Sequence, residues 1–516
     1  MPAENVSLPK FTSSGTIVMP SAWARSGDMS DAESVTTATR DTGGALPLVS
    51  PGAADRCPRF AALRPMIRPP LPCRAMDRSL WAVLAGTFTL RFSTGLTGAM
   101  LAFYLANLDQ HHRPLDLLLG LGPGVEVGAL AFAVIHASFY LSELALSPIF
   151  GVLSDRLGHW KVMQFGPFFG AVAVVATWAT TNLPMIVGTR LLEGAATAAS
   201  IPSILGFIAA ATALDEGLRG RAVARFEAAT LAGLLAGFVA AGPLFQLLGP
   251  EAFLLNGAFY GVSLAIYRYG VDPRLDAKPD EHALERRGLD LGRYARILRQ
   301  SHVWLLAPTW IAINAALGLF TTQTIFQLVQ REAPDPRFAD QLLMGGFEPI
   351  QISIGLAIGG LLFFAGLIYW GNRFKSLRRT TIILYGLGGG ALLVVGAVGI
   401  NHSSGLAPIA IALFGVPAVF GLFVLAGATP AAIGLLADVT EAYPEDRGAI
   451  MGLYSVFLGF GQIGGSLIAG FAAERFGLDG IFGASIVLLG IAVVPLISLR
   501  RYEHYLAGPA RPATVD

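Results

Sequence analysis

Long apolar segments alternate with short polar ones along most of this chain. They begin near Ser79 and end near Leu499, and between Leu80 and Ala106 the only charged residue is Arg91. In a lipid bilayer a helix satisfies its own backbone hydrogen bonds, and about 20 residues cross the apolar layer of roughly 30 Å. The pattern therefore predicts membrane-spanning helices at 80–106, 129–150, 161–180, 184–211, 222–248, 252–270, 303–329, 349–371, 380–400, 407–436, 447–472 and 479–499.

Composition agrees with helices that lie in lipid. The 516 residues are 53% hydrophobic and only 14% charged, and the net charge of +1 provides no basic surface for nucleic acid. Cys57 and Cys73 are the only cysteines and precede the first predicted helix, so the membrane part can hold no cysteine metal site. The sequence has no H-E-x-x-H spacing and no Walker motif. We therefore expect no metal, no cofactor and no enzymatic activity.

The longest charged segment between predicted helices divides the chain into two halves. We expect a six-helix bundle at 77–270, a linker at 271–301, a second six-helix bundle at 302–501 and a tail at 502–516. Residues 1–76 are rich in Pro, Ser, Thr, Ala and Arg, which is typical of disorder, and an alternative is that synthesis starts near Met66 or Met76. The predicted fold class is an all-α membrane protein with twelve transmembrane helices in two pseudo-symmetric six-helix bundles.

The two halves repeat each other in sequence. The pair Arg219-Gly220 at the start of the fifth helix recurs as Arg447-Gly448 at the start of the eleventh, 228 residues later. At the same offset three glycines of the fifth helix match three of the eleventh. Small residues let neighbouring helices approach closely, and parallel repeats are typical of transporters. The predicted helix-packing residues are Gly233, Gly237, Gly242, Pro243, Gly461 and Gly465, with Gly470 as the partner of Gly242.

Lysine and arginine are distributed unevenly over the predicted loops. If the amino terminus lies inside, the outer loops contain only Arg113, Arg331, Arg337 and Arg475, and most of the other basic loop residues lie on the inner side. Basic residues favour the cytoplasmic side. We therefore predict a multi-pass protein of the plasma membrane with both termini cytoplasmic.

Four charges lie inside predicted spans of the first half: Arg91, Glu143, Arg190 and Glu193. Charges at this depth are costly and usually mark a hydrated path or a pair. One hypothesis is a proton and charge relay in which Glu143 or Glu193 carries the proton. The alternative is two fixed ion pairs, Arg91–Glu143 and Arg190–Glu193, that only hold helices together.

Polar residues at helical spacing accompany these charges and predict a shared cavity. The seventh helix offers further hydrogen-bonding groups, although polar packing between helices is an equal alternative. The predicted cavity residues are Thr87, Thr94, His136, Tyr140, Thr197, Asn314, Thr321 and Gln323.

The loop after the second predicted span reads GVLSDRLGHWK, from Gly151 to Lys161. It resembles the signature loop of the major facilitator superfamily at Gly151, Asp155, Arg156, Gly158 and Lys161, whereas Trp160 stands where the family usually has a basic residue. Two weaker matches follow: RLLEGAATA from Arg190, and GLLAGFVAAGP from Gly233, which resembles the motif of the drug/proton antiporter branch.

The resemblance implies twelve helices, alternating access and often proton coupling. For the loop itself we expect a gating role, in which Asp155 accepts bonds from helix amides and Arg156 pairs across the interface between halves. The alternative is that Arg156 and Lys161 only fix the topology.

These observations favour a secondary transporter that exports small organic molecules by proton-coupled alternating access. Its expected partners are the substrate, protons and the lipid bilayer, with no nucleic acid, and we expect a monomer. One alternative is uptake of an organic anion bound through Arg91 and Arg190. A more distant alternative is a membrane enzyme or receptor.

Overall fold

The computed structural model describes the backbone of residues 73–506, with gaps at 109–112, 123, 214, 277–302, 332–334, 374–375, 404–408, 410, 433 and 436–446. The described chain is helical, and its one isolated β-bridge joins Val329 and Phe347. The predicted amino-terminal tail before residue 73, most of the linker and the last ten residues lie outside this description.

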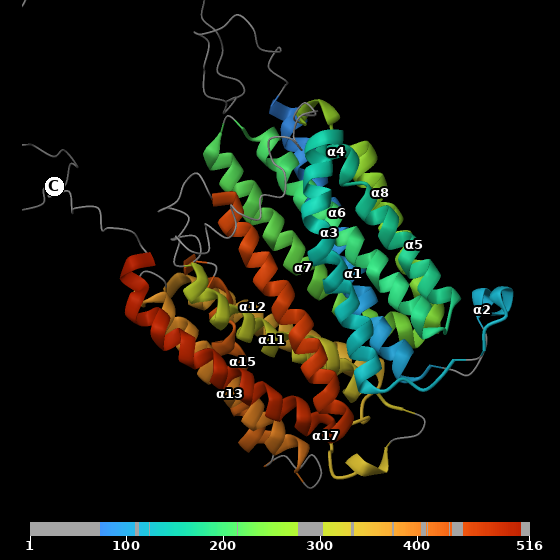
Figure 1. Cartoon of the computed structure of the whole chain (residues 1–516), viewed down its shortest axis with the longest axis vertical. Coiled ribbons are helices and arrows are strands. Elements are labelled where there is room, and N and C mark those ends of the chain that lie inside the picture. Colours follow the sequence, from blue (N-terminus) through green and yellow to red (C-terminus); the bar gives the residue numbers. More distant parts are fainter. Residues whose placement is uncertain are drawn as a thin grey trace, which may run out of the picture. The chain divides into compact units, whose positions relative to one another are not determined.

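The helices follow the predicted order (Figure 1). In the first half they are α1 (Cys73–Ala106), α2 (Pro114–Leu119), α3 (Ala129–Leu157), α4 (His159–Val162), α5 (Phe165–Ala179), α6 (Leu183–Ala211), α7 (Glu216–Leu248) and α8 (Ala252–Ala265), which a π-turn, η2 (Ile266–Gly270), extends. In the second half they are α11 (Val303–Leu328), α12 (Pro349–Asn372), α13 (Arg379–Asn401), the π-turn η6 (Ile411–Gly415), α15 (Val416–Leu425) and α17 (Arg447–Leu506).

Wherever their residues are described, the twelve predicted spans coincide with helical structure, which confirms the fold class. Within the described residues, nine helical stretches are long and apolar enough to cross a membrane. Two of them, Gly217–Gly270 and Val456–Arg501, each contain two predicted spans. Gly249 (φ 58°) and Gly477 (φ 61°) make the turns inside these stretches, and this left-handed backbone favours glycine.

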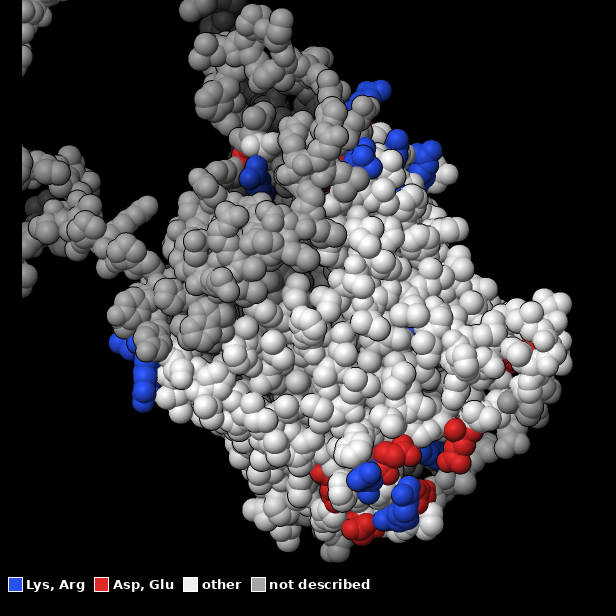
Figure 2. All heavy atoms as spheres, viewed as in Figure 1, with Lys and Arg blue, Asp and Glu red and all other residues white. Residues whose placement is uncertain are grey.

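Side chains on the outside of the bundles are apolar. On α12, for example, Ile358, Leu361 and Ile368 are 63%, 71% and 68% exposed. Figure 2 shows that the charged side chains visible on this face gather near the ends of the helices, and most of the surface between them is white. This distribution is typical of a surface that faces lipid.

The two halves use their matched glycines in the same way. A Cβ atom at Gly237 of α7 would overlap the carbonyl oxygen of Phe92 on α1, and one at Gly465 of α17 would overlap that of Ala315 on α11. These glycines therefore allow the backbones of each pair to touch.

The third glycine of each set reaches the opposite half. Gly242 of α7 packs on Pro349 and Ser353 of α12, and its amide donates to Ser353 Oγ (2.8 Å). Gly470 of α17 packs on Ala129 and Ala133 of α3. The repeat in the sequence therefore corresponds to a repeat in packing. Gly242 of the first half contacts the second half, and its counterpart Gly470 of the second half contacts the first.

For the description below, the end of the bundles that carries the 151–161 loop and the start of the linker is called the linker end. The other end, which carries the α5–α6, α7–α8 and α11–α12 connections, is called the distal end.

Candidate functional site

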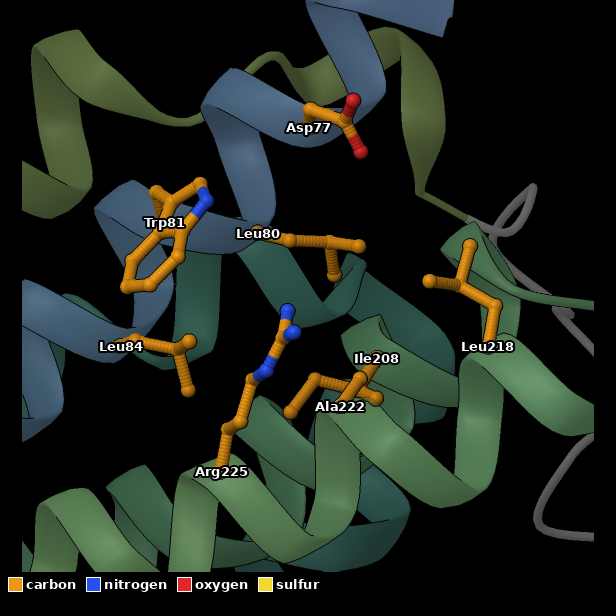
Figure 3. Close-up of a pocket in the computed structure, with 8 residues that line it drawn as sticks. All are labelled: Asp77, Leu80, Trp81, Leu84, Ile208, Leu218, Ala222 and Arg225. Atoms are coloured by element: carbon orange, nitrogen blue, oxygen red, sulfur yellow. The ribbon is translucent and has the colours of Figure 1, made fainter. Parts of the chain in front are cut away.

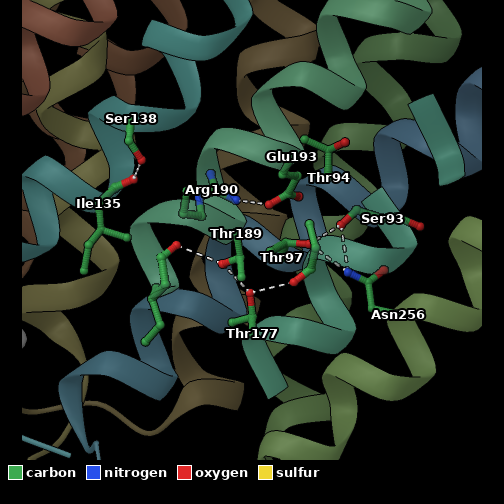
Figure 4. A network of polar contacts seen from close by, with 12 residues as sticks. Ser93, Thr94, Thr97, Ile135, Ser138, Thr177, Thr189, Arg190, Glu193 and Asn256 are labelled. Carbon is green, nitrogen blue, oxygen red and sulfur yellow. Dashed lines mark hydrogen bonds and ion pairs between the residues drawn. The ribbon is translucent and has the colours of Figure 1, made fainter. Parts of the chain in front are cut away.

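A buried ion pair lies on α6. Arg190 and Glu193 are one helical turn apart, only 3% and 2% exposed, and Arg190 Nη1 binds Glu193 Oε2 (Figure 4). Of the two ion pairs considered from the sequence, this one is present. A buried charge needs such a partner because desolvation would otherwise be costly.

Three neighbouring helices hold this pair in place. Tyr260 of α8 donates to Glu193 Oε1 (3.0 Å), and the Tyr260 hydroxyl lies 3.4 Å from Thr94 Oγ1 of α1. The Arg190 guanidinium lies 4.8 Å from the centre of the Phe139 ring of α3. With both of its oxygens engaged, Glu193 is a fixed structural group in this conformation.

Further hydrogen bonds tie the helices of the first half together around the pair. Asn256 of α8 donates to the Ser93 carbonyl (3.1 Å) and to Thr97 Oγ1 (2.8 Å) of α1, and Thr177 of α5 donates to Thr189 of α6 (2.8 Å; Figure 4). These bonds satisfy polar groups that lipid cannot solvate.

The second predicted ion pair is absent. Arg91 of α1 and Glu143 of α3 are both partly buried, and neither has an ion-pair partner among the residues that the structure describes. The charge of Arg91 nevertheless acts on Glu143 and on Glu227 of α7. One cation therefore lies near two carboxylates without a fixed bond to either.

His136 of α3 is a buried polar residue without a hydrogen bond. It is 7% exposed, and both of its ring nitrogens lack a partner in the described part of the chain. Its ring centroid lies 5.6 Å from that of Tyr140 and 6.2 Å from that of Phe132, and Phe132 stacks on Phe326 of α11 at 4.4 Å. The imidazole thus lies beside an aromatic contact between the two halves.

Other predicted cavity residues face their neighbours within a half. Thr87 is 1% exposed, donates to the Val83 carbonyl (2.7 Å) and lies 3.3 Å from the Tyr267 hydroxyl of η2. Asn314 donates to the Trp310 carbonyl of its own helix (2.8 Å).

Three predicted cavity residues occupy different surroundings. Thr321 is exposed and donates to the Leu317 carbonyl (3.1 Å), whereas Thr197 is 4% exposed inside the first half. Gln323 is fully buried and donates across the interface to the Ala129 carbonyl of α3 (2.8 Å). The structure therefore does not bring all the predicted cavity residues together.

The signature loop is a tight turn held by the start of the linker. Gly158 separates α3 from α4, and its positive φ of 96° is a conformation that favours glycine. Asp276 accepts from the Trp160 amide (2.8 Å) and binds His159 Nδ1 (2.8 Å), and His159 Nε2 lies 3.3 Å from Asp155. A linker carboxylate thus caps α4, a role that we had expected of Asp155.

The basic residues of this loop point outward. Arg156 and Lys161 are exposed, and Arg156 has no ion-pair partner among the described residues. Within the described part of the chain Arg156 does not pair across the halves, and the gating role stays a prediction.

The distal end is closed by contacts between the halves. Glu474 of α17 accepts from the Leu130 amide in the first turn of α3 (3.1 Å), beside the bond from Gln323 to Ala129. Further bonds join Asn107 to Gln330, Gln246 to Glu348, and Ser353 to Gly242 and Phe238. Every hydrogen bond that joins the halves within the described residues is near this end.

A pocket at the linker end lies within the first half. It is a small pocket that is open to solvent and is lined by α1, α6 and α7 (Figure 3). Arg225 extends from α7 toward α1, with its guanidinium 5.6 Å from the centre of the Trp81 ring. None of the predicted cavity residues lines it.

Sequence reasoning missed several polar residues of the site. Glu227 is an acidic residue inside the predicted span 222–248, so its position was a usable signal. Asp276, Glu474 and Asn256 carry no such signal, because the first two lie in predicted connections between spans and the third is uncharged. Their roles depend on which elements the fold brings beside them.

Comparison with known proteins identifies the family to which this chain is similar. The family model described as Major Facilitator Superfamily matches residues 83–423 and 346–514. The methylenomycin A resistance protein of Bacillus subtilis is 27% identical over 251 residues, and this match covers 48% of the chain and 51% of that protein. The quinolone resistance protein NorA of Staphylococcus aureus is 22% identical over 402 residues, covering 77% of the chain and 90% of that protein.

Solved structures share the fold at low sequence identity. The nucleoside transporter NupG superposes with a TM-score of 0.55 at 14% identity, over 81% of this chain and 98% of that one. The human organic anion transporter MFSD10 (TETRAN) gives a TM-score of 0.55 at 16% identity, over 84% and 100%. The apolar helices in two packed halves, the glycine-bearing signature loop and the family match thus lead to one conclusion: this chain belongs to the major facilitator superfamily, whose members are multi-pass membrane transporters and not enzymes.

Proposed function

We propose that the protein exports small organic molecules in exchange for protons, by alternating access between its halves. The observation that carries this proposal is the difference between the two candidate carboxylates inside the predicted spans. Glu193 is bound by Arg190 and Tyr260, whereas Glu143 lies near Arg91 with no ion-pair partner among the described residues. Of the two candidates for proton carrier, Glu143 is therefore the one we select.

A proton carrier must change its charge at low cost during the transport cycle. Protonating Glu193 would break a buried ion pair and leave Arg190 uncompensated, which costs several kcal/mol. Protonating Glu143 breaks no direct bond, and movement of α1 relative to α3 would alter its distance from Arg91. That change in distance supplies the coupling between proton binding and conformation.

The substrate path follows from the closed distal end. With the halves joined there, a substrate would enter from the linker end, which we assign to the cytoplasm together with both termini. We assign the distal end to the outside of the cell, because its connections contain few basic residues: Arg113, Arg331, Arg337 and Arg475. The names of the resistance relatives support the export direction.

The groups beside the interface favour a flat substrate with a hydrogen-bonding group. His136 has two ring nitrogens free to bond, and Tyr140, Phe132 and Phe326 provide aromatic surface near it. Apolar walls with a few polar groups are typical of small-molecule sites.

Transport in proteoliposomes with an imposed pH gradient tests the proposal. A quinolone antibiotic is the first probe, because a relative carries that name. We expect Glu143→Gln to abolish the stimulation by the gradient while downhill substrate movement continues. Glu193→Gln is the matched control and should reduce stability and both kinds of movement together. Stimulation that survives in Glu143→Gln would refute the assignment of the carrier.

A second candidate function is uptake of an organic anion. It is favoured by Arg91, a partly buried cation with no ion pair among the described residues, whereas Arg190 is neutralised by Glu193. Binding of a radiolabelled aromatic carboxylate that is kept in Arg91→Lys and lost in Arg91→Ala would support uptake. Equal binding of the carboxylate and its methyl ester would argue against it.

The gating role of the signature loop is part of the proposed cycle. His159 and Trp160 are bonded to Asp276, so the loop and the start of the linker would move as one unit. We expect Asp276→Ala to slow the exchange between conformations.

A further inference from the structure

The short helix α2 lies outside every membrane span and is fixed at its buried side. Asp116 is completely buried and accepts bonds from the Thr180 hydroxyl, from the Thr181 amide (2.8 Å) and from the Thr181 hydroxyl (2.8 Å). Burial alone would raise the pKa of Asp116, but these bonds and one from the Arg113 amide together hold that pKa below its ordinary value of 3.8. The carboxylate is thus an anchor.

A second anchor lies at the start of the helix. Arg113 Nη1 is 3.6 Å from Glu251 Oε1, and Glu251 ends the turn between α7 and α8. Thr180 and Thr181 belong to the turn between α5 and α6. Because both anchors rest on turns at the distal end, α2 is held at the depth where the spans end.

The three leucines that follow Asp116 in α2 are largely uncovered by the described chain. Leu117, Leu118 and Leu119 are 65%, 79% and 54% exposed. Figure 1 shows α2 projecting from the bundle, and in the same view in Figure 2 that segment is almost entirely white. Three exposed leucines in a row are unusual on a surface that faces water.

We propose that α2 is an interfacial anchor whose leucines insert into the boundary between headgroups and acyl chains of the leaflet at the distal end. The depth set by the two anchors matches this boundary, where amphipathic helices bind. The helix also contacts α5, whose apolar side chains Val172 and Val175 are 44% and 41% exposed. A phospholipid surface is therefore the occupant of the space around the exposed leucines.

The binding is apolar and independent of headgroup charge. Residues 114–119 contain no basic side chain, and the adjacent Arg113 is paired with Glu251. Anionic lipids attract lysine and arginine, so they gain nothing extra from this helix.

A fluorescent reporter in the full-length protein tests the proposal. Cys57→Ser and Cys73→Ser together give a cysteine-free background. In this background Leu118→Cys is labelled with an environment-sensitive dye, and the protein is reconstituted into vesicles of neutral phosphatidylcholine or of anionic phosphatidylglycerol. Asp340→Cys is the control, because its side chain is 71% exposed in another distal loop. We expect a blue-shifted emission at position 118, with strong quenching by headgroup-near spin-labelled lipid, weak quenching by aqueous iodide and the same values in both lipids.

Two outcomes would overturn the inference. One is iodide quenching at position 118 as strong as at position 340, which would place the leucines in water. The other is a blue shift that disappears when lipid is added in excess over protein, which would identify a second copy of the chain as the occupant. Adding Asp116→Asn should weaken the lipid quenching at 118, and unchanged quenching would refute the anchoring role of Asp116. The test requires no transport, so it stands apart from the proposed function.

Discussion

Three glycines of α17, Gly464, Gly465 and Gly470, have different surroundings, so the same substitution can be compared at three sites. Replacing each with alanine adds one methyl group. At Gly464 nothing lies within 4 Å of the new Cβ, at Gly465 it would overlap the Ala315 carbonyl of the same half, and at Gly470 it would overlap the Ala133 side chain of the opposite half. The structure therefore predicts three different results from one chemical change.

The magnitudes follow from two opposing effects. Forcing a methyl group into a packed contact costs about 1–3 kcal/mol, whereas alanine is favoured over glycine inside a helix by about 0.5–1 kcal/mol. Gly464→Ala should thus leave the free energy of unfolding unchanged or raise it by up to about 1 kcal/mol. Gly465→Ala should lower it by up to about 2.5 kcal/mol, because the methyl group separates α17 from α11.

Gly470→Ala has another way to relieve the overlap, since the halves can separate at the distal end. A cost of about 1–3 kcal/mol that falls only on the closed arrangement shifts the equilibrium roughly 5- to 150-fold toward a distally open one. We therefore expect a change in conformation rather than in stability.

The assay is thiol labelling of Ala129→Cys in the cysteine-free background by a membrane-impermeant maleimide. Ala129 is 6% exposed in the closed interface. Labelling should be faster in Gly470→Ala than in the parent, and unchanged in Gly464→Ala and Gly465→Ala. Equal rates in Gly470→Ala and Gly464→Ala would refute the reasoning, and an equal increase in Gly465→Ala would show general loosening instead.

Three further predictions concern single polar groups. The pKa of Asp116 is lower in the folded protein than its ordinary value, so its contribution to stability is present above about pH 4 and is lost as pH falls through the folded pKa. In denaturation series, the difference in unfolding free energy between the parent and Asp116→Asn should therefore shrink below about pH 4. A difference that stays constant with pH would contradict this. Tyr260→Phe removes one of the donors to buried Glu193 and should lower the free energy of unfolding by about 1–3 kcal/mol in chemical denaturation, so a neutral effect would mean that water replaces the hydroxyl. Glu474→Ala removes an acceptor from the first turn of α3, and a loss of about 1 kcal/mol from the closed state should speed the labelling of Ala129→Cys roughly fivefold; labelling at the parental rate would remove Glu474 from the closure.

The elements of the fold could be predicted because their signal is local. Where the structure describes them, the long apolar runs are helical, since a span in lipid must satisfy its own backbone. The matched glycines Gly237 and Gly465 lie close to the backbones of equivalent helices, α1 and α11. Which glycine would cross to the other half, as Gly242 and Gly470 do, was not in the pattern because the arrangement of the halves is a tertiary property.

The site was predicted only in part, for a physical reason. Residues one turn apart on a helix are certain to be neighbours, so the pair of Arg190 and Glu193 followed from spacing. Arg91 and Glu143 belong to different helices, and their pairing depended on rotation and tilt, which periodicity does not determine. Asp276 replaces Asp155 as the cap of α4 because the linker folds back onto the loop, and no local pattern encodes that return.

The return of the linker onto the loop changes where the amino-terminal half ends. The π-helix η2 ends at Gly270, but the chain continues through a single 3-10 turn, η3 (Pro273–Leu275), and stays attached through Asp276. The first half therefore carries a six-residue strap, 271–276, that shields the junction of α3 and α4. A protein split into two separately expressed fragments should accordingly reassemble when the break comes after Asp276, while a break directly after Gly270 would strip the strap from its own bundle. A chimera of such proteins should therefore exchange the first bundle together with its strap, residues 271–276.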